Sequence, residues 1–200
     1  MKSGRLEAFS DGVLAIIITI MVLELHVPET QEGHGATFAD LGNSGLGPIF
    51  LSYVLSFAYI AIYWNNHHHV MALVRRVTPA IMWANMLLLF AISLVPFSMS
   101  WLGANPLEPA PTVLYALVLL LCGVCYYLLM RLIVATHPAD SQVARALSRD
   151  RKGQVSLISY SLAVALAFVA PAVATAMLFG VAILWIVPDR RIERALAHEG

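Results

Sequence analysis

The stretch RLEAFSDGVLAIIITIMVLEL, from Arg5 to Leu25, decides the fold because it joins a long apolar run to a carboxylate near each end. Its charge-free part, Gly12 to Leu23, would be about 18 Å long as an α-helix. The hydrocarbon core of a bilayer is about 30 Å thick. If this segment crosses a membrane, Asp11 and Glu24 lie close to the hydrocarbon and must face protein or water. We therefore expect a membrane helix whose polar residues contact other helices or a water-filled passage.

The composition of the whole chain indicates an integral membrane protein. Of the 200 residues, 60% are hydrophobic and 12% are charged, whereas a soluble domain is about half apolar and about a quarter charged. The net charge of zero argues against a nucleic-acid partner, which would require a strongly basic face. Cys122 and Cys125 lie in an apolar run without a second pair, so we interpret them as packing residues. We expect neither a metal site nor a cofactor.

Six apolar segments alternate with short polar loops. They cover residues 8–26, 48–66, 79–102, 112–135, 155–170 and 173–187. Most approach the ~20 residues that a membrane-spanning helix requires. The last two surround Pro171, and one straight helix across both would be about 50 Å long, so we expect a hairpin of two short spans. The loops are too short for a separate core, so residues 1–200 are predicted to form a single all-α transmembrane domain.

The charged residues predict the orientation of these spans. All 12 Lys and Arg residues lie at the termini or in alternate loops: Lys2, Arg5, Arg75, Arg76, residues 131–152 and residues 190–194. The intervening loops contain Glu29, Glu32, Asp40 and Glu108 but no Lys or Arg. Because cytoplasmic loops are enriched in basic residues, both termini are predicted to be cytoplasmic and the number of spans even.

Helical-wheel positions divide the first span into two apolar stripes. One contains Gly12, Ile16, Thr19, Ile20 and Leu23, and the opposite one contains Leu14, Ile18, Met21 and Leu25. Since both are apolar, periodicity does not decide which stripe faces lipid, neighbouring helices or a pore. The polar residues have local alternatives too: Thr19 could bond back to its own helix, and Ser10 with Asp11 could cap a helix N-terminus.

Further polar residues are expected at the cytoplasmic depth of the second and third spans. The second span ends in YWNNHHHV (Tyr63 to Val70), and the third contains MWANMLLLF (Met82 to Phe90). Three consecutive histidines point in different directions around a helix, so they do not coordinate one metal ion from one face. Asn65, Asn66, His67 and Asn85 approach Asp11 and Arg5 if the first three spans pack side by side. Buried polar groups in a membrane require such partners and tend to mark function.

These residues carry a resemblance to a known family. Arg5, Phe9, Ser10, Asp11 and Thr19 match the signature R-x-x-x-F-S-D-x-x-x-x-x-x-x-T of the transmembrane protein 175 family. That family comprises potassium channels of endosomes and lysosomes, with shorter prokaryotic relatives. The downstream order is also similar, with Trp64, His67, Trp83, Asn85 and then SLVPF at residues 93–97. The resemblance covers nearly the whole chain, and the residues that are most specific to the family lie in the first three spans.

The resemblance implies a potassium channel in which the first helices of the subunits line a central pore. At the matching positions, Ile16, Ile20 and Leu23 would form a hydrophobic constriction, and Thr19 would form a polar ring. A structural polar network would tie the first helix to its neighbours through Arg5, Ser10, Asp11, Trp64, His67 and Asn85. The single six-span unit implies a homotetramer in the bilayer of a prokaryotic cell membrane.

Other functions remain open from the residues alone. A proton-conducting relative is compatible with a hydrophobic gate near histidines. A membrane enzyme would need a nucleophile or a carboxylate pair within a complete constellation, which the sequence does not display. A membrane assembly protein that conducts nothing is the third alternative. The chain contains no T-V-G-Y-G-like loop, so a filter of backbone carbonyls is not expected.

Overall fold

The structure, a computed structural model, describes residues 3–27, 37–138, 141, 144 and 150–186. Within these residues the fold is entirely helical, without a strand. The elements are α1 (Ser3–Ile20), the 3-10 turn η1 (Met21–Glu24), α2 (Phe38–Asn43), α3 (Leu46–Ala72), α4 (Pro79–Ser93), α5 (Val95–Ala104), α6 (Pro109–Val134), α8 (Arg151–Ala167) and α9 (Pro171–Ile186).

Four of these units are long and apolar enough to cross a membrane. They are Ser3–Glu24, Leu46–Ala72, Pro79–Ala104 and Pro109–Val134, which correspond to the first four predicted segments. The last two segments form α8, with 17 residues, and α9, with 16 residues. A helix of 16 residues is about 24 Å long, which is shorter than the hydrocarbon core. The structure therefore supports four spans directly, and six spans stay a prediction.

Prolines and capping side chains set the helix boundaries. Thr78 caps α4 by accepting a hydrogen bond from the Ile81 N–H, and Pro79 occupies the first turn, where its missing N–H costs nothing. Pro96 has no N–H to offer the preceding turn, and the third span is interrupted at Leu94, between α4 and α5. Pro171 begins α9, so the expected hairpin of two short helices is present as α8 and α9.

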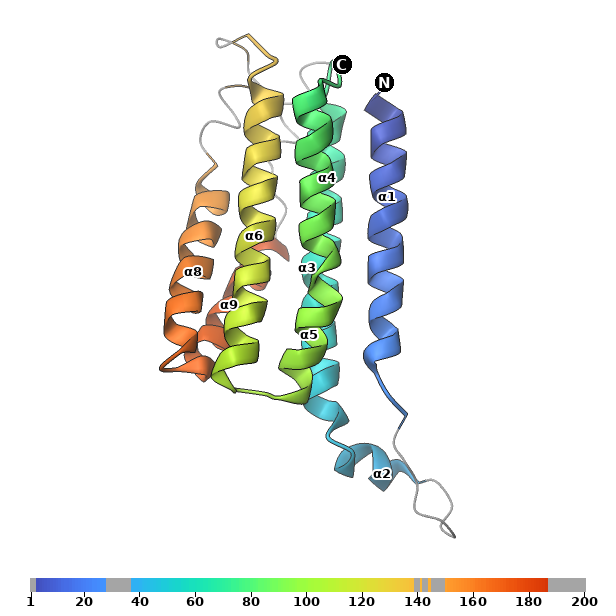
Figure 1. Ribbon diagram of the computed structural model, residues 1–200, viewed down its shortest axis with the longest axis vertical. Coiled ribbons are helices and arrows are strands. Elements are labelled where there is room, and N and C mark those ends of the chain that lie inside the picture. Colours follow the sequence, from blue (N-terminus) through green and yellow to red (C-terminus); the bar gives the residue numbers. More distant parts are fainter. Residues whose placement is uncertain (1–2, 28–36, 139–140, 142–143, 145–149, 187–200) are drawn as a thin grey trace.

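The helices form a bundle with α1 at one side and α8 at the other (Figure 1). The helix α1 packs against α3 and α4, whereas α6 packs against α4, α5 and α8. The helix α9 covers α8 and also contacts α3 and α6. The short helix α2 lies beyond the end of the bundle (Figure 1). Because α1 touches two neighbouring helices along one side only, much of its surface lies outside the core of the subunit.

Apolar side chains and a few polar pairs hold the bundle together. The Tyr59 hydroxyl donates to the Leu178 carbonyl at 2.6 Å and joins α3 to α9. The hydroxyls of Ser56 and Tyr115 are 2.8 Å apart and join α3 to α6. Cys122 and Cys125 are buried free thiols in the core, as their interpretation as packing residues requires.

The closest approach between α3 and α5 depends on Gly103. A β-carbon added at Gly103 would lie 2.8 Å from the Cα of Ile49, a backbone atom that cannot move aside easily. We expect Gly103→Ala to destabilise the fold by about 1–3 kcal/mol, because overpacking forces backbone shifts. Thermal unfolding in detergent measures the effect. The matched control is Gly180→Ala, where no atom lies within 4 Å. Equal melting temperatures for the two variants would contradict the close contact.

Candidate functional site

One face of the helix α1 is buried in the core of its own subunit. Its buried side chains are Leu6, Ser10, Leu14, Ile17 and, in η1, Met21. They recur every three or four residues, which is the spacing of one helical face. Of the two apolar stripes in the sequence, the one containing Leu14 and Met21 is therefore the packed stripe.

The opposite stripe of α1 is exposed in the subunit. Ile16 is 64% exposed, Ile20 48% and Leu23 71%, and Thr19 lies exposed between them. An apolar surface of this kind needs a partner that is not water, which in a membrane protein is lipid, another subunit or a narrow pore. The four residues expected to line a pore thus share one face of one helix.

The Thr19 hydroxyl bonds back to its own helix. It donates to the carbonyls of Ala15, at 2.9 Å, and Ile16, at 3.0 Å. This is the local alternative considered from the sequence. Since the proton is used within the helix, only the oxygen lone pairs are left for a ligand. Thr19 therefore presents an acceptor on the exposed stripe, which suits a cation.

A buried chain of hydrogen bonds fastens α1 to α3 and α4. Ser10 donates to the Leu6 carbonyl at 2.9 Å, so its oxygen accepts from the Asn85 Nδ2 at 2.9 Å. The amide oxygen of Asn85 consequently faces His67, 2.7 Å from Nε2, and that nitrogen must donate. Ser10, Asn85 and His67 have no exposed surface. Three helices are thereby joined through two side-chain hydrogen bonds in the interior.

This chain also determines the form of His67. With Nε2 donating to Asn85, the neutral imidazole carries its proton on Nε2 and leaves Nδ1 as an acceptor. Nδ1 is buried, and no hydrogen-bond partner for it exists among the described residues. Such a site holds a neutral ring more readily than a charged one.

A second attachment lies beside the buried chain and is more exposed. The Trp64 Nε1 donates to the Asp11 Oδ1 at 3.1 Å. One turn further along α3, His68 Nδ1 lies 2.8 Å from the Glu7 Oε1. The rings of Trp64 and His68 are stacked with centroids 6.5 Å apart. Two residues four apart on α3 thus hold two carboxylates four apart on α1.

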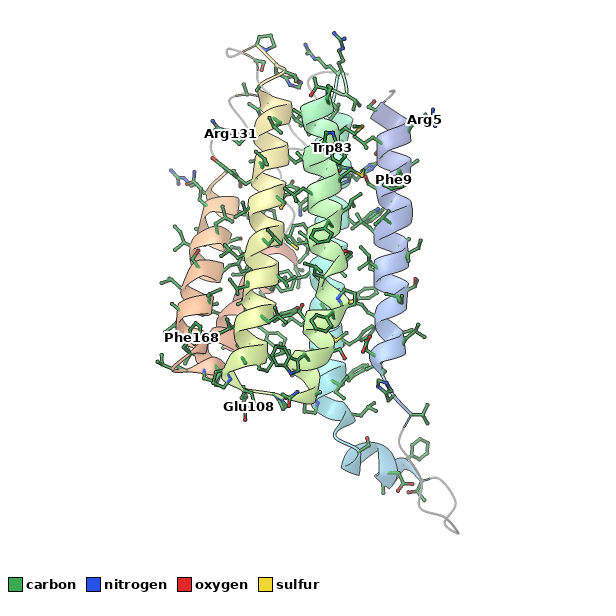
Figure 2. The ribbon with its side chains drawn as sticks, viewed as in Figure 1. Arg5, Phe9, Trp83, Glu108, Arg131 and Phe168 are labelled. Atoms are coloured by element: carbon green, nitrogen blue, oxygen red, sulfur yellow. The ribbon has the colours of Figure 1, made fainter. Side chains whose placement is uncertain are left out.

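The structure differs from the sequence expectations in three respects. Ser10 lies inside α1, so it does not cap the helix N-terminus. Arg5 is exposed at the end of α1 (Figure 2) and makes no hydrogen bond or ion pair among the described residues. The contact between Glu7 and His68 was not anticipated, although their matching spacing to Asp11 and Trp64 is the signal that would have indicated it.

The three histidines of α3 serve separate partners. His67 faces Asn85, His68 faces Glu7, and the His69 ring lies 2.6 Å from the Asn65 carbonyl. Within the described part of the chain, no three His, Cys, Asp or Glu side chains are grouped closely enough to hold a metal ion. His67 and His68 join α3 to α4 and α1, whereas His69 bonds within α3.

Comparison with known proteins assigns the family. The profile of the family described as "Endosomal/lysosomal potassium channel TMEM175" matches residues 5–96, which include the exposed stripe and both attachments. A protein of Chryseobacterium named a potassium channel is 43% identical over 196 residues, and the alignment covers 98% of each chain. The chain belongs to the TMEM175 family.

Two further relatives show the range of this family. A crystal structure described as a lysosomal potassium-selective channel TMEM175 homolog from Chamaesiphon minutus matches with a TM-score of 0.76 and 29% identity, over 92% of this chain and 96% of that chain. The bovine protein named endosomal/lysosomal proton channel TMEM175 is 35% identical over 116 residues, which are 54% of this chain and 24% of the bovine one. The family consists of ion channels and not of enzymes, so the enzyme alternative is excluded.

The buried chain makes a prediction about stability. Asn85→Leu leaves Ser10 and His67 without a partner, so we expect a loss of about 1–3 kcal/mol in the free energy of unfolding. Asn105→Leu is the matched control, because Asn105 is exposed and its side chain, among the described residues, bonds to the Trp101 carbonyl of its own turn. Unfolding in SDS measures both. A double-mutant cycle with Ser10→Ala should give a coupling of about 0.5–1.5 kcal/mol; a coupling of zero contradicts the contact.

Proposed function

We propose that this protein is a potassium-selective cation leak channel, a homotetramer whose four α1 helices line a central pore. The observation that carries the proposal is the exposed stripe of Ile16, Thr19, Ile20 and Leu23, which lies opposite the face that packs on α3 and α4. The names of the Chryseobacterium and Chamaesiphon relatives support potassium as the ion. A tetramer gives four copies of the stripe a common axis and removes it from lipid.

The subunit is proposed to span the membrane six times as one domain, with both termini in the cytoplasm. Arg5 and Arg131 lie toward one end of the bundle, and Glu108 lies toward the other (Figure 2). This separation of charge fits a cytoplasmic end at Arg5 under the positive-inside rule. The hairpin of α8 and α9 then supplies the fifth and sixth spans. The cell membrane of a prokaryote is the proposed location, since the relatives of similar length are bacterial.

Ile16, Ile20 and Leu23 are proposed to form the constriction. Rings of branched apolar side chains around a narrow axis expel water from the passage, and a dry passage stops ions. An ion that crosses must lose part of its water shell, and potassium releases water more easily than sodium. The Thr19 oxygens, whose protons are used within the helix, replace part of the lost water. The channel then requires no filter of backbone carbonyls.

The polar attachments are proposed to position α1 and not to bind ions. Ser10, Asn85 and His67 join α1 to its neighbours in the interior, and Asp11 and Trp64 do so at the surface. Arg5 belongs to the family signature at the cytoplasmic end of the same helix. These groups lie at the end of α1 away from Leu23, so they fix one end of the pore helix.

Proton conduction by the same architecture is the second candidate. The mammalian relatives are named proton channels, and the bovine one matches 54% of this chain. A hydrophobic constriction also passes protons along a transient water file more readily than metal ions. The two candidates differ in which gradient drives flux.

Flux into liposomes tests the proposed function. Purified protein is reconstituted, and the uptake driven by potassium, sodium and proton gradients is compared. We expect potassium uptake at least about tenfold above sodium uptake. Proton flux in the absence of potassium flux would favour the second candidate. No flux of any of the three from folded, oligomeric protein would contradict an ion channel.

Ile16→Asn tests the constriction. An amide in place of the sec-butyl group keeps water in the passage, so we expect potassium flux to rise about tenfold or more. Ile158→Asn is the matched control, because Ile158 is 61% exposed but lies on α8. Equal effects of the two variants, or a loss of flux from a well-folded Ile16→Asn tetramer, would place the constriction elsewhere.

Thr19→Val and Thr19→Ser test the polar ring. Valine has the shape of threonine without the hydroxyl oxygen, so it should lower the ratio of potassium to sodium permeability by about threefold or more. Serine keeps the oxygen and should keep the ratio. Reversal potentials in asymmetric potassium and sodium solutions give the ratio directly. An unchanged ratio in both variants would show that Thr19 does not contact the ion.

A further inference from the structure

The end of the first span carries a carboxylate that neither attachment uses. Glu24 is the last residue of η1, half-buried, and lines a groove of about 750 Å³ between η1 and α5. Ile20, which also belongs to the exposed stripe of α1, lines the same groove. The third span contributes Ser93 from the end of α4 and Phe97, Ser100 and Trp101 from α5. Among the described residues, the lining contains one acidic residue and no basic one.

The 3-10 winding of η1 directs Glu24 away from the stripe. Four residues of α-helix turn by about 400°, so an α-helical Glu24 would lie only about 40° from Ile20 and continue the apolar stripe. Four residues of 3-10 helix turn by about 480°, which places Glu24 about 120° from Ile20. η1 packs against α3 and α5, so the carboxylate lies at the wall of the groove next to the stripe.

The chemistry of the groove suits a hydrated cation. The Ser93 hydroxyl donates its proton to the Phe90 carbonyl at 2.7 Å, so its oxygen acts as an acceptor. Phe97 and Trp101 offer aromatic faces, which attract cations. The volume far exceeds the ~30 Å³ of one water molecule, so an ion retains its water shell there. These features favour attraction of a cation over tight coordination.

The loops on the same side of the proposed membrane as Glu24 are also negatively charged. Glu29, Glu32, Asp40 and Glu108 belong to the loops on this side in the proposed topology, and these loops contain no Lys or Arg. Surfaces lined by one sign of charge raise the local concentration of counter-ions by about tenfold or more. Glu24 adds a further carboxylate, and it lies in η1, directly after the pore helix α1.

We propose that Glu24 forms a recruitment site for hydrated monovalent cations at the outer mouth of the pore, next to the constriction at Leu23 and Ile20. The proposal rests on the proposed function, because only the tetramer brings four copies of this groove, each with its Glu24, to the rim of one pore. Ions collect at this site with their water shells and lose part of the water at the next ring. Glu24 therefore sets how fast ions arrive, and the apolar rings with Thr19 set which ions pass.

Single-channel conductance at two salt concentrations tests this site. The Debye length is about 30 Å at 0.01 M and about 3 Å at 1 M, so a recruiting charge matters only in dilute salt. In symmetrical KCl at about 0.01 M, Glu24→Gln should lower the conductance by about threefold or more, and at about 1 M the variant and wild type should agree. Glu24→Asp keeps the charge and should keep most of the conductance at both concentrations.

Glu108→Gln is the matched control. Glu108 is an exposed acid directly before α6, at the end of the bundle away from Arg5 (Figure 2). In the proposed topology it lies on the same side of the membrane as Glu24, but it is not among the residues that line the groove. Its loss should lower the conductance at 0.01 M by clearly less than the loss of Glu24 does, because Glu108 lies outside the groove next to the constriction. Wild-type conductance of Glu24→Gln at 0.01 M would overturn the site. So would an equal loss at both concentrations, because that result indicates a distorted pore.

Two further results are informative. If Glu24→Gln does not assemble, Glu24→Cys labelled with an anionic or a neutral thiol reagent replaces it, since Cys122 and Cys125 are buried. The anionic label should restore conductance at 0.01 M and the neutral label should not; equal conductance with both labels would overturn the site. A wild-type protein that passes no potassium at either concentration would contradict the proposed function itself, and the recruitment site with it.

Discussion

The side-chain amide of Asn85 is the contact on which the placement of the first helix depends. Its nitrogen donates to Ser10 on α1, and its oxygen accepts from His67 on α3. All three side chains are fully buried. In a protein interior surrounded by lipid, an unpaired polar group costs more than the bond itself is worth, so the three groups must stay together. This requirement fixes the rotation of α1 and therefore decides which of its two apolar faces is left outside the core.

The two ends of α1 are held by different forces. The polar contacts involve Glu7, Ser10 and Asp11, all within the first half of the helix. Beyond them, α1 and η1 are held by the apolar side chains of Leu14, Ile17 and Met21. Apolar packing has no directional requirement. A tilt of α1 therefore costs the least free energy in the half that carries Ile16, Thr19, Ile20 and Leu23. This is the half that would have to move if the constriction opens and closes.

The sequence predicts the positions of the helices well and their ends less well. The apolar runs predict the spans, and Pro171 predicts the final hairpin. However, α1 begins at Ser3 and α3 continues to Ala72, several residues beyond the apolar runs. Hydropathy marks the part of a helix in lipid, whereas backbone hydrogen bonds continue through polar residues such as His67. For this reason Ser10 lies inside a helix and is not a cap.

The candidate site depends on information that periodicity does not contain. Both stripes of α1 are apolar, so only packing against α3 and α4 distinguishes them. The depth of these residues predicted that Asn85 approaches Asp11 and Arg5, because buried polar groups need partners. In the structure its partner on α1 is Ser10, the neighbour of Asp11. The direction of Glu24 depends on a change from α to 3-10 winding at Met21. Nothing in the sequence MVLE specifies that change.

Cysteine accessibility tests most directly whether the exposed stripe of α1 lines the ion pathway. The native thiols Cys122 and Cys125 are buried, so a thiol placed at Leu23, which is 71% exposed, is the one that a charged reagent reaches. If α1 lines the pore, a cationic methanethiosulfonate added from the outer side should modify Leu23→Cys and abolish the potassium current, while Leu162→Cys on α8 keeps its current. Complete modification of Leu23→Cys with an undiminished current would contradict a pore lined by the first helix.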